Sequence, residues 1–279
     1  MAPHSRTIRI AARASAFILA ANPIIASTSA GAATGPVAAP AAMSGPARHL
    51  PAGAVHGLRA AEKTSTNWDG YAALGDTFTS VSAAWVEPAV SCTGQDEYAG
   101  FWVGFDGWTN GSVEQGGTSA YCSGGHATYE AWWEMYPYNQ IQNSFTINAG
   151  DAITASVTYN TSTADFTIVV NDVTSGQSMS KVTACHSDQN GCPRTSAEVI
   201  SEDIGNGSNT DNLYYLPNYG TATYADSSIT DSAGVTGAFS NSAWSNDAIT
   251  EVSSTGLTKQ TTSALTSGGA GFSTTWQHV

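Results

Sequence analysis

Carboxyl groups alternate with aromatic side chains in one stretch of the sequence, residues 128–136. Glu130, Trp132, Glu134 and Tyr136 occupy alternate positions there, and alternate residues of an extended strand lie on the same face. A face of this composition suits the floor of a cleft, because aromatic rings can contact a substrate while carboxyl groups form hydrogen bonds. The alternative is an exposed face with two surface acids beside structural aromatic residues.

Three other stretches carry groups of the same kinds. The two-residue period places Glu198 and Glu202 on one face of a strand, and Trp102 and Asp106 on one face of another. Gln115 is followed by two glycines, which would allow the backbone of a ligand to approach closely. Taken singly, a residue of these types is more often a solvated side chain. Their combination favours a cleft whose side chains take part in a reaction.

The elements that would position these groups are β-strands. Runs rich in β-branched and aromatic residues are separated by turn sequences such as residues 148–151 and 175–176. The runs are residues 77–86, 101–105, 128–136, 144–148, 152–159, 166–170, 178–184 and 221–224. No stretch favours a helix convincingly, so the sequence predicts an all-β fold, an antiparallel sandwich or barrel.

The charged residues are few and unevenly placed. The chain has 9 Lys and Arg against 22 Asp and Glu, and from residue 61 onward four basic residues face all 22 acidic ones, a formal charge of −18. We expect no nucleic acid partner, because phosphate binding needs a basic surface. Acidification to about pH 4 would neutralise most of these carboxylates, so the composition favours a protein that works in acid. Near neutral pH, by contrast, we expect the carboxylates to repel one another.

The N-terminal segment has the organisation of an export signal. Basic residues through Arg13 precede a short apolar run, residues 14–21, and small residues follow, which is the order of a secretory signal peptide. The run is too short to span a bilayer, so no membrane association is expected; a disordered tail without an export role is the alternative. We therefore expect a secreted, extracellular protein with a signal peptide over residues 1–30, a pro-segment or linker over 31–62 and a folded domain over 63–279.

Four cysteines, Cys92, Cys122, Cys185 and Cys192, lie in the acidic part of the chain. An even number in an exported protein predicts disulfides. Of the three possible connectivities we favour Cys92 with Cys122 and Cys185 with Cys192, because the second pair would close a short polar loop. A metal site is the weaker alternative, since no CxxC or HxxxH spacing is present.

Common hydrolase signatures are absent from the sequence. It contains no HExxH zinc motif, no GxSxG nucleophile elbow, and no Asp-Thr-Gly or Asp-Ser-Gly pair. Only His126 and His186 lie in the central part of the chain, and His186 falls inside the loop that Cys185 and Cys192 would close. A histidine-based triad is therefore a poor candidate.

Five blocks of sequence, in order and at similar spacing, resemble the glutamic peptidases, also called eqolisins or the G1 family. The blocks are residues 67–71 (NWDGY), 102–107 (WVGFDG), 114–117 (EQGG), 129–137 (YEAWWEMYP) and 197–203 (AEVISED). One departure is Glu130, where fungal members have Asp, so that the carboxyl group lies one methylene further out. The resemblance implies an acid-active, secreted endopeptidase made with a pro-segment and folded as an antiparallel β-sandwich of two long sheets, a concanavalin-like jelly roll.

The resemblance also implies the site residues. Position by position, the catalytic pair falls on Gln115 and Glu202, and the residues that support it or bind substrate fall on Trp102, Asp106, Glu130, Trp132 and Glu134. It implies polypeptide substrates and no metal or other cofactor, and we expect a monomer.

A mechanism without a covalent intermediate follows as a hypothesis. Glu202 would remove a proton from the attacking water and return it to the leaving amine, while Gln115 would orient that water and donate to the oxyanion. Two alternatives stay open. One is a β-sandwich glycoside hydrolase with paired carboxylates such as Glu134 and Glu202, and the other is a non-enzymatic carbohydrate-binding sandwich.

Overall fold

The computed structural model describes residues 63–138, 140–186, 189, 191–205 and 212–278. All of these residues belong to one unit of the chain, Met43–Val279. The expected signal peptide over residues 1–30 and pro-segment over 31–62 lie outside the described residues. The division of the chain at residue 63 therefore stays a prediction.

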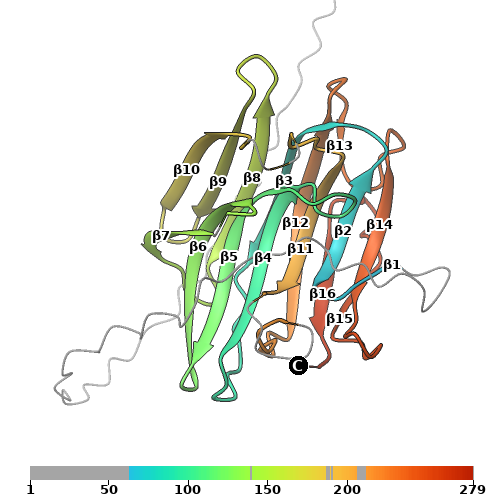
Figure 1. The fold of residues 1–279 in the computed structure, drawn as a ribbon. Coiled ribbons are helices and arrows are strands. Elements are labelled where there is room, and N and C mark those ends of the chain that lie inside the picture. The colour runs from blue at the N-terminus through green and yellow to red at the C-terminus, as the bar shows by residue number, and fades with distance from the viewer. Residues whose placement is uncertain (1–62, 139, 187–188, 190, 206–211, 279) are drawn as a thin grey trace, which may run out of the picture. The chain divides into compact units, whose positions relative to one another are not determined.

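The described residues form strands and no helix, arranged as two large sheets (Figure 1). The first sheet contains, in spatial order, β1 (Lys63–Ser65), β14 (Ser245–Glu251), β2 (Trp68–Leu74), β11 (Ser196–Asp203), β4 (Glu97–Phe105), β5 (Val113–Ser123), β6 (His126–Tyr136) and β7 (Ile141–Thr146). The second contains β10 (Gln177–Ala184), β9 (Asp165–Asp172), β8 (Ala152–Asn160), β3 (Phe78–Val86), β12 (Thr221–Asp231), β16 (Phe272–Trp276) and β15 (Gln260–Thr262), with β13 (Thr236–Gly237) beside β12. In the part of the chain that the structure describes, no helix could cross a membrane.

The pairing within the sheets is almost entirely antiparallel. β1 runs parallel to β14, and the other neighbours in the two sheets are antiparallel. Each run of β-branched and aromatic residues that the sequence predicted as a strand overlaps an observed strand. The expected antiparallel β-sandwich is confirmed.

A two-residue alternation of apolar side chains explains why the sheets stack. Buried residues alternate with more exposed ones along β8 and β9, namely Ile153, Ala155 and Val157, and Phe166, Ile168 and Val170. They join alternate residues of β4 and β6 in one hydrophobic core. A sheet with one apolar face is stable only when that face is covered, and here each sheet covers the other.

Gly116 marks a close approach of the two sheets. A Cβ on this residue would lie 2.4 Å from Cγ2 of Ile168 in β9, and a Cβ on Gly117 would lie 2.1 Å from the carbonyl oxygen of Phe101. No side chain fits at either position, because real Cβ contacts are longer. Packing within the protein therefore explains both glycines, and the expected approach of a ligand backbone is not needed to account for them.

Both predicted disulfides are present. Cys92, in the segment after β3, is joined to Cys122 in β5, and Cys185 is joined to Cys192 in the segment between β10 and β11. Their Cα atoms are 5.6 and 6.0 Å apart, within the usual range for a disulfide. The connectivity favoured from the sequence is confirmed.

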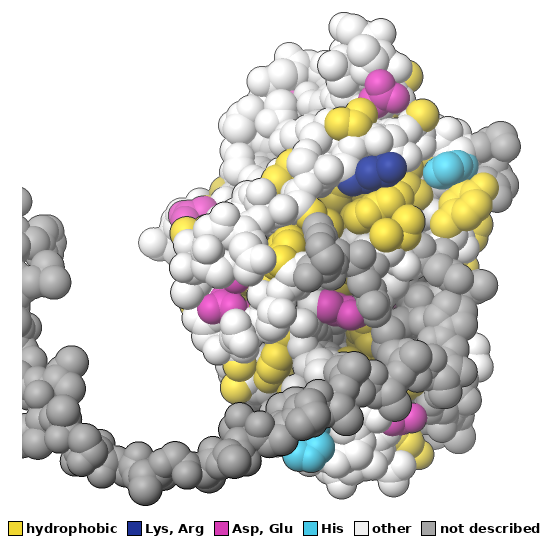
Figure 2. Space-filling model, turned by 90° about the vertical axis from the view of Figure 1, so that its left-hand side faces the viewer, with side chains coloured by type: hydrophobic (Ala, Val, Ile, Leu, Met, Phe, Trp, Pro, Cys, Tyr) yellow, Lys and Arg dark blue, Asp and Glu magenta, His cyan; other side chains and the backbone are white. Residues whose placement is uncertain are grey.

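The acidic residues are largely hidden from solvent. More than half of the 22 Asp and Glu side chains are buried. On the side of the molecule shown in Figure 2, the visible acidic side chains are scattered singly over a mostly uncharged surface. The high negative charge of the sequence is therefore carried in large part by groups inside the fold, where burial disfavours the charged form.

Candidate active site

One face of the first sheet points away from the core between the sheets. Along β6, Ala131 and Met135 belong to that core, whereas Trp132 belongs to a separate cluster with Trp68 and Trp102. This outer face of β6 carries the alternating set predicted from the sequence, Glu130, Trp132, Glu134 and Tyr136. The predicted division of the strand into two faces is confirmed.

The strand register arranges the outer face in three rows across β11, β4, β5 and β6. One row contains Glu202, Gly100, Ser119 and Glu130. The next contains Ile200, Trp102, Gly117 and Trp132, and the third contains Glu198, Gly104, Gln115 and Glu134. Glu202 and Gln115 thus lie on the same face of the same sheet, on either side of the row that contains Trp102.

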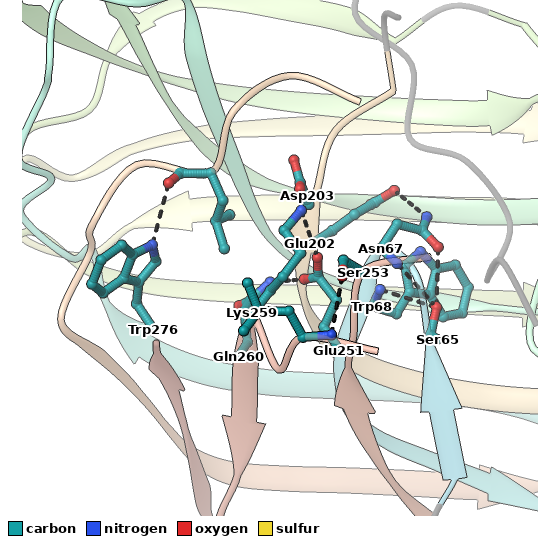
Figure 3. A network of polar contacts seen from close by, with 12 residues as sticks. Ser65, Asn67, Trp68, Glu202, Asp203, Glu251, Ser253, Lys259, Gln260 and Trp276 are labelled. Atoms are coloured by element: carbon teal, nitrogen blue, oxygen red, sulfur yellow. Dashed lines mark hydrogen bonds and ion pairs between the residues drawn. The ribbon is translucent and has the colours of Figure 1, made fainter. Parts of the chain in front are cut away.

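Glu202 is buried and accepts hydrogen bonds from two N–H groups. Nε1 of Trp102 donates to Oε2 over 2.7 Å. Nδ2 of Asn67 donates to Oε1 over 3.3 Å, and the Ser65 hydroxyl donates to Oδ1 of that asparagine over 3.1 Å (Figure 3). Donors of this kind stabilise a carboxylate more than a carboxylic acid, so these two N–H groups favour the ionised form of Glu202.

Gln115 is fully buried in β5. Its Nε2 donates to Oε2 of Glu134, the residue opposite it on β6, over 3.3 Å. Its amide oxygen accepts no hydrogen bond from the described residues. An amide NH₂ has two donor hydrogens, so Glu134 can orient the group while the second N–H and the amide oxygen remain available to a substrate or a water.

The indole of Trp102 connects these two positions. Its Nε1 contacts Glu202, and its opposite edge reaches Gly104. A Cβ on Gly104 would lie 3.0 Å from Cζ3 of Trp102 and 2.9 Å from Cβ of Gln115. Trp68 packs edge to face against Trp102 with the ring centroids 4.8 Å apart, an arrangement favourable for aromatic pairs that holds the indole in place.

Asp106 organises the loops at the end of β4. The residue has a φ of 67°, and its carboxylate accepts hydrogen bonds from Nδ2 of Asn110 over 2.7 Å and from the backbone N–H groups of Arg194 and Thr195 over 2.7 and 2.8 Å. These bonds tie the loop after β4 to the segment that leads into β11. Asp106 therefore supports the strands that carry Gln115 and Glu202.

Glu130 belongs to a separate set of hydrogen bonds. Tyr98 donates its hydroxyl to Oε1 of Glu130 over 2.6 Å, and Nε2 of Gln140 donates to the same oxygen over 3.1 Å and to the Tyr98 hydroxyl over 2.8 Å. Tyr98 stacks on Tyr214 at 5.6 Å. This end of the outer face is thus bounded by tyrosines.

Residues 66–276 match the family model described as the peptidase A4 family. This chain belongs to that family. Its members are the glutamic peptidases, or eqolisins, so the resemblance seen in the sequence is confirmed and the protein is a peptidase. Membership leaves the glycoside hydrolase and carbohydrate-binding alternatives without support.

Two curated proteins are similar to this glutamic peptidase in sequence. Aspergillopepsin-2 of Aspergillus niger is 29% identical over 197 residues, which cover 63% of this chain and 68% of that protein. Scytalidopepsin B of Scytalidium lignicola is 35% identical over 174 residues, which cover 59% of this chain and 64% of that protein.

Solved structures of the family have the same fold. Scytalido-glutamic peptidase with a transition state analog inhibitor has a TM-score of 0.64 and 28% identity, and the match covers 76% of this chain and 98% of that one. Aspergilloglutamic peptidase from Aspergillus niger has a TM-score of 0.54 and 25% identity, covering 65% of this chain and 99% of that one.

Two acidic residues near the site of this glutamic peptidase resist ionisation. Burial raises the pKa of Glu198 well above its ordinary value, and the charge of Asp106 adds to the shift. Burial and then the charge of Asp106 raise the pKa of Glu114 in the same way. Glu198 is therefore a neutral acid at low pH, although it shares a strand and a face with Glu202.

The one group of donor atoms among the described residues that is spaced like a metal site does not fit a metal ion. In the part of the chain described here, one group could hold an ion by geometry: Cys92, Glu97 and Cys122. Its two cysteines are joined in a disulfide, and Oε2 of Glu97 accepts the backbone N–H of Thr93 over 2.7 Å. Disulfide sulfurs are not thiolates and make poor ligands.

Sequence reasoning assigned no role to three residues of the site, Asn67, Tyr98 and Gln140. Asn67 lies in the first block that resembles the family, but its contact with Glu202 joins residues 135 positions apart. Tyr98 and Gln140 lie outside the five blocks. Alternate residues of a strand share a face, so Tyr98 lies on the same face of β4 as Trp102. This two-residue period is the signal in the sequence that points to Tyr98.

Proposed function

We propose that this glutamic peptidase is a secreted endopeptidase that works in acid, with Glu202 as general base and Gln115 as the residue that holds the water and the oxyanion. The observation that supports the proposal is that these residues lie on one face of one sheet, at opposite edges of the Trp102 indole. A peptide bond bound over this ring would lie between a carboxylate and a carboxamide.

Glu202 takes the proton in the first step. The carboxylate removes a proton from water as the water oxygen forms its bond to the scissile carbonyl carbon. The electron pair of the carbonyl moves to its oxygen, and the second Nε2 hydrogen of Gln115 donates to that oxyanion. The first Nε2 hydrogen stays with Glu134, which keeps the amide oriented.

The second step restores the carboxylate. The carbonyl re-forms, the bond from carbon to nitrogen breaks, and the proton held by Glu202 passes to the leaving amine. Trp102 and Asn67 donate to the carboxylate before the first step and after the second. The cycle forms no covalent bond to the protein and needs no cofactor.

Acid operation follows from the chemistry of the two groups. A base that works in acid has to be ionised where an ordinary carboxyl group begins to protonate, at about pH 4. The N–H donors on Glu202 favour its ionised form. A carboxamide keeps its donors at any pH, so Gln115 does not lose its role when the solution is acidified.

Polypeptides are the proposed substrates, and export the proposed destination. Related structures contain a peptide-based transition state analog in one case and the tripeptide Ala-Ile-His in another. On the outer face of this chain, a cluster of buried tryptophans is flanked by the partly buried Trp108 and Tyr136, and we propose that an extended peptide binds along it. Two disulfides suit an oxidising compartment, and we propose that the protein acts as a monomer.

Hydrolysis of acid-denatured protein from about pH 2 to pH 7 tests the proposal. Glu202→Gln should lower the rate by about a thousandfold or more, because the base is lost, and Gln115→Ala should lower it about a hundredfold or more. Glu198→Gln is the matched control. It should stay within a few-fold of wild type, because an amide resembles the neutral acid that Glu198 is in acid. Full activity of Glu202→Gln, or a maximum at neutral pH, would contradict the proposal.

A further inference from the structure

A buried lysine lies at the end of the strand that carries Glu202. Lys259, just before β15, has its ammonium group in contact with Oδ2 of Asp203 and 3.1 Å from Oε1 of Glu251 (Figure 3). The side chains of all three residues are almost completely buried. Asp203 directly follows Glu202 in β11, so the ion pairs reach the residue next to the proposed base.

The main chain of Lys259 also ties several elements together. Its N–H donates to the carbonyl oxygen of Glu251 over 2.9 Å, and its own carbonyl accepts the N–H groups of Gln277 and His278 over 2.8 and 3.2 Å. The next residue, Gln260, donates its side-chain amide to Glu251 and accepts the hydroxyl of Tyr219. The ammonium group is therefore held by residues of β11 and β14, while the main chain of Lys259 leads into β15 of the other sheet.

The proposed chemistry gives this lysine no part, and burying it is costly. Taking a charge out of water is unfavourable unless partners compensate, and the substitution of a buried ion pair by apolar residues is often neutral or stabilising. The position is also the single buried Lys or Arg among the described residues. The cost of burying this cation points to a role beyond stability.

Two carboxyl groups are electrostatic neighbours of Glu202, namely Asp203 on β11 and Glu251 on β14. Both contact the ammonium group of Lys259. Lys259 is the cation of this set. Charges on Asp203 and Glu251 oppose the charge of Glu202 directly.

We propose that Lys259 is a positioning residue of the site, whose positive charge lets Glu202 stay ionised in acid while its contacts with Asp203 and Glu251 fix the end of β11. The inference rests on the proposed role of Glu202. A positive charge held close to a carboxylate lowers its affinity for a proton, and neighbouring carboxylates raise that affinity. Without Lys259, Glu202 would take up its proton at a higher pH and lose its function as a base there.

The test compares the pH dependence of kcat/KM on a fluorogenic peptide between Asp203→Asn and Asp203→Asn/Lys259→Met. The asparagine background is used because removing the lysine alone would leave Asp203 buried without a partner. The acid limb of the double variant, the pH at which activity is half lost on acidification, should lie about one pH unit higher. Lys259→Arg keeps the charge and should keep the wild-type limb to within about 0.3 pH units.

The near-ultraviolet circular dichroism spectrum is recorded at each pH to follow the fold. An unmoved acid limb in the double variant with a native spectrum would overturn the inference, whatever the change in kcat. Loss of the native spectrum across the acid range would also overturn it, since the cation would then serve the fold alone. Glu202→Gln is measured in parallel: if it stays active, the proposed function fails, whereas an inactive Glu202→Gln with an unmoved limb overturns only the role of Lys259.

Discussion

Trp102 donates its indole N–H to Oε2 of Glu202 over 2.7 Å while the far edge of the same ring lies over Gly104, beside Gln115. One rigid side chain therefore sets the spacing between the proposed base and the proposed oxyanion donor. Trp68, packed against the ring, limits its motion. The chemistry of the site depends on an aromatic residue that does not itself exchange a proton.

Replacing Trp102 by phenylalanine keeps a ring in the cluster but removes the donor to Glu202. We expect kcat/KM in acid to fall about ten- to a hundredfold, because a hydrogen bond to a charged group contributes about 1.5–3 kcal/mol. The acid limb should also move to higher pH, since the ionised form of Glu202 loses a donor. Steady-state kinetics between about pH 2 and pH 6 measure both effects.

Trp108→Phe is the matched control for that experiment. Trp108 donates its indole N–H to Oδ2 of Asp247 over 2.9 Å, so the variant removes the same kind of bond from a different carboxylate. Its acid limb should coincide with that of wild type. Equal shifts in the two variants would show that the contact with Glu202 has no special role.

Gly104→Ala should damage the site through crowding. The added Cβ would lie 2.9 Å from both Cβ of Gln115 and the Glu114 carbonyl oxygen and 3.0 Å from the Trp102 ring, so these groups would have to move. We expect a loss of roughly 1–3 kcal/mol in the free energy of unfolding and a fall in kcat larger than any change in KM. Gly111→Ala, where no atom lies within 4 Å of the new Cβ, should leave both unchanged; a harmless Gly104→Ala would contradict the packing described.

The stability of the fold should decrease as the pH rises. Burial raises the pKa of Glu87 from 4.5 to about 8, although Thr118 and Trp85 donate hydrogen bonds to it. Because the pKa of this group is higher in the folded state than in the unfolded chain, binding of its proton stabilises the fold. This contribution is complete below about pH 4.5 and is lost as the pH rises through about 8. The loss for this one group is on the order of 5 kcal/mol at most. Asp69, Glu114 and Glu198, whose pKa values burial also raises, act in the same direction.

Urea unfolding at about pH 4, 6 and 8 measures this dependence. Glu87→Gln should make the free energy of unfolding less dependent on pH across that window, because the neutral amide does not titrate. Asp226→Asn changes an exposed carboxylate and should leave the slope as it is in wild type. A wild-type protein that is more stable at pH 8 than at pH 4 would show that the buried carboxyl groups do not act as described.

The two disulfides should stabilise the fold unequally. Cys92 and Cys122 are 30 residues apart and Cys185 and Cys192 are 7 apart, and a longer closed loop restricts the unfolded chain more. Replacing the first pair by alanine should cost about 3–4 kcal/mol and replacing the second about 2 kcal/mol. Urea unfolding in acid compares the two double variants with wild type; the reverse order would point to native contacts around Cys185 as the larger effect.

Local patterns in the sequence were enough for the fold class and for the faces of β6. The alternation of Glu130, Trp132, Glu134 and Tyr136 with core residues depends only on the two-residue period of a strand, and the structure keeps it. The disulfide pairing was also within reach, because a gap of 7 residues between Cys185 and Cys192 makes a short loop. The interpretation of Gly116 and Gly117 as room for a ligand stays a prediction, because packing against Ile168 of the other sheet and against Phe101 of the neighbouring strand already accounts for both glycines.

The amino-acid sequence by itself determined that this protein is a β-sandwich of the glutamic peptidases, and which residue types are available to its site. Only the tertiary structure decided which of them meet: Trp102 reaches Glu202 across 100 positions of sequence, and Lys259 reaches Asp203 across 56. The reason is that hydrogen-bond register between distant strands, and the packing of one sheet on the other, set these distances. No local period contains that information, because it belongs to pairs of strands and not to any single one.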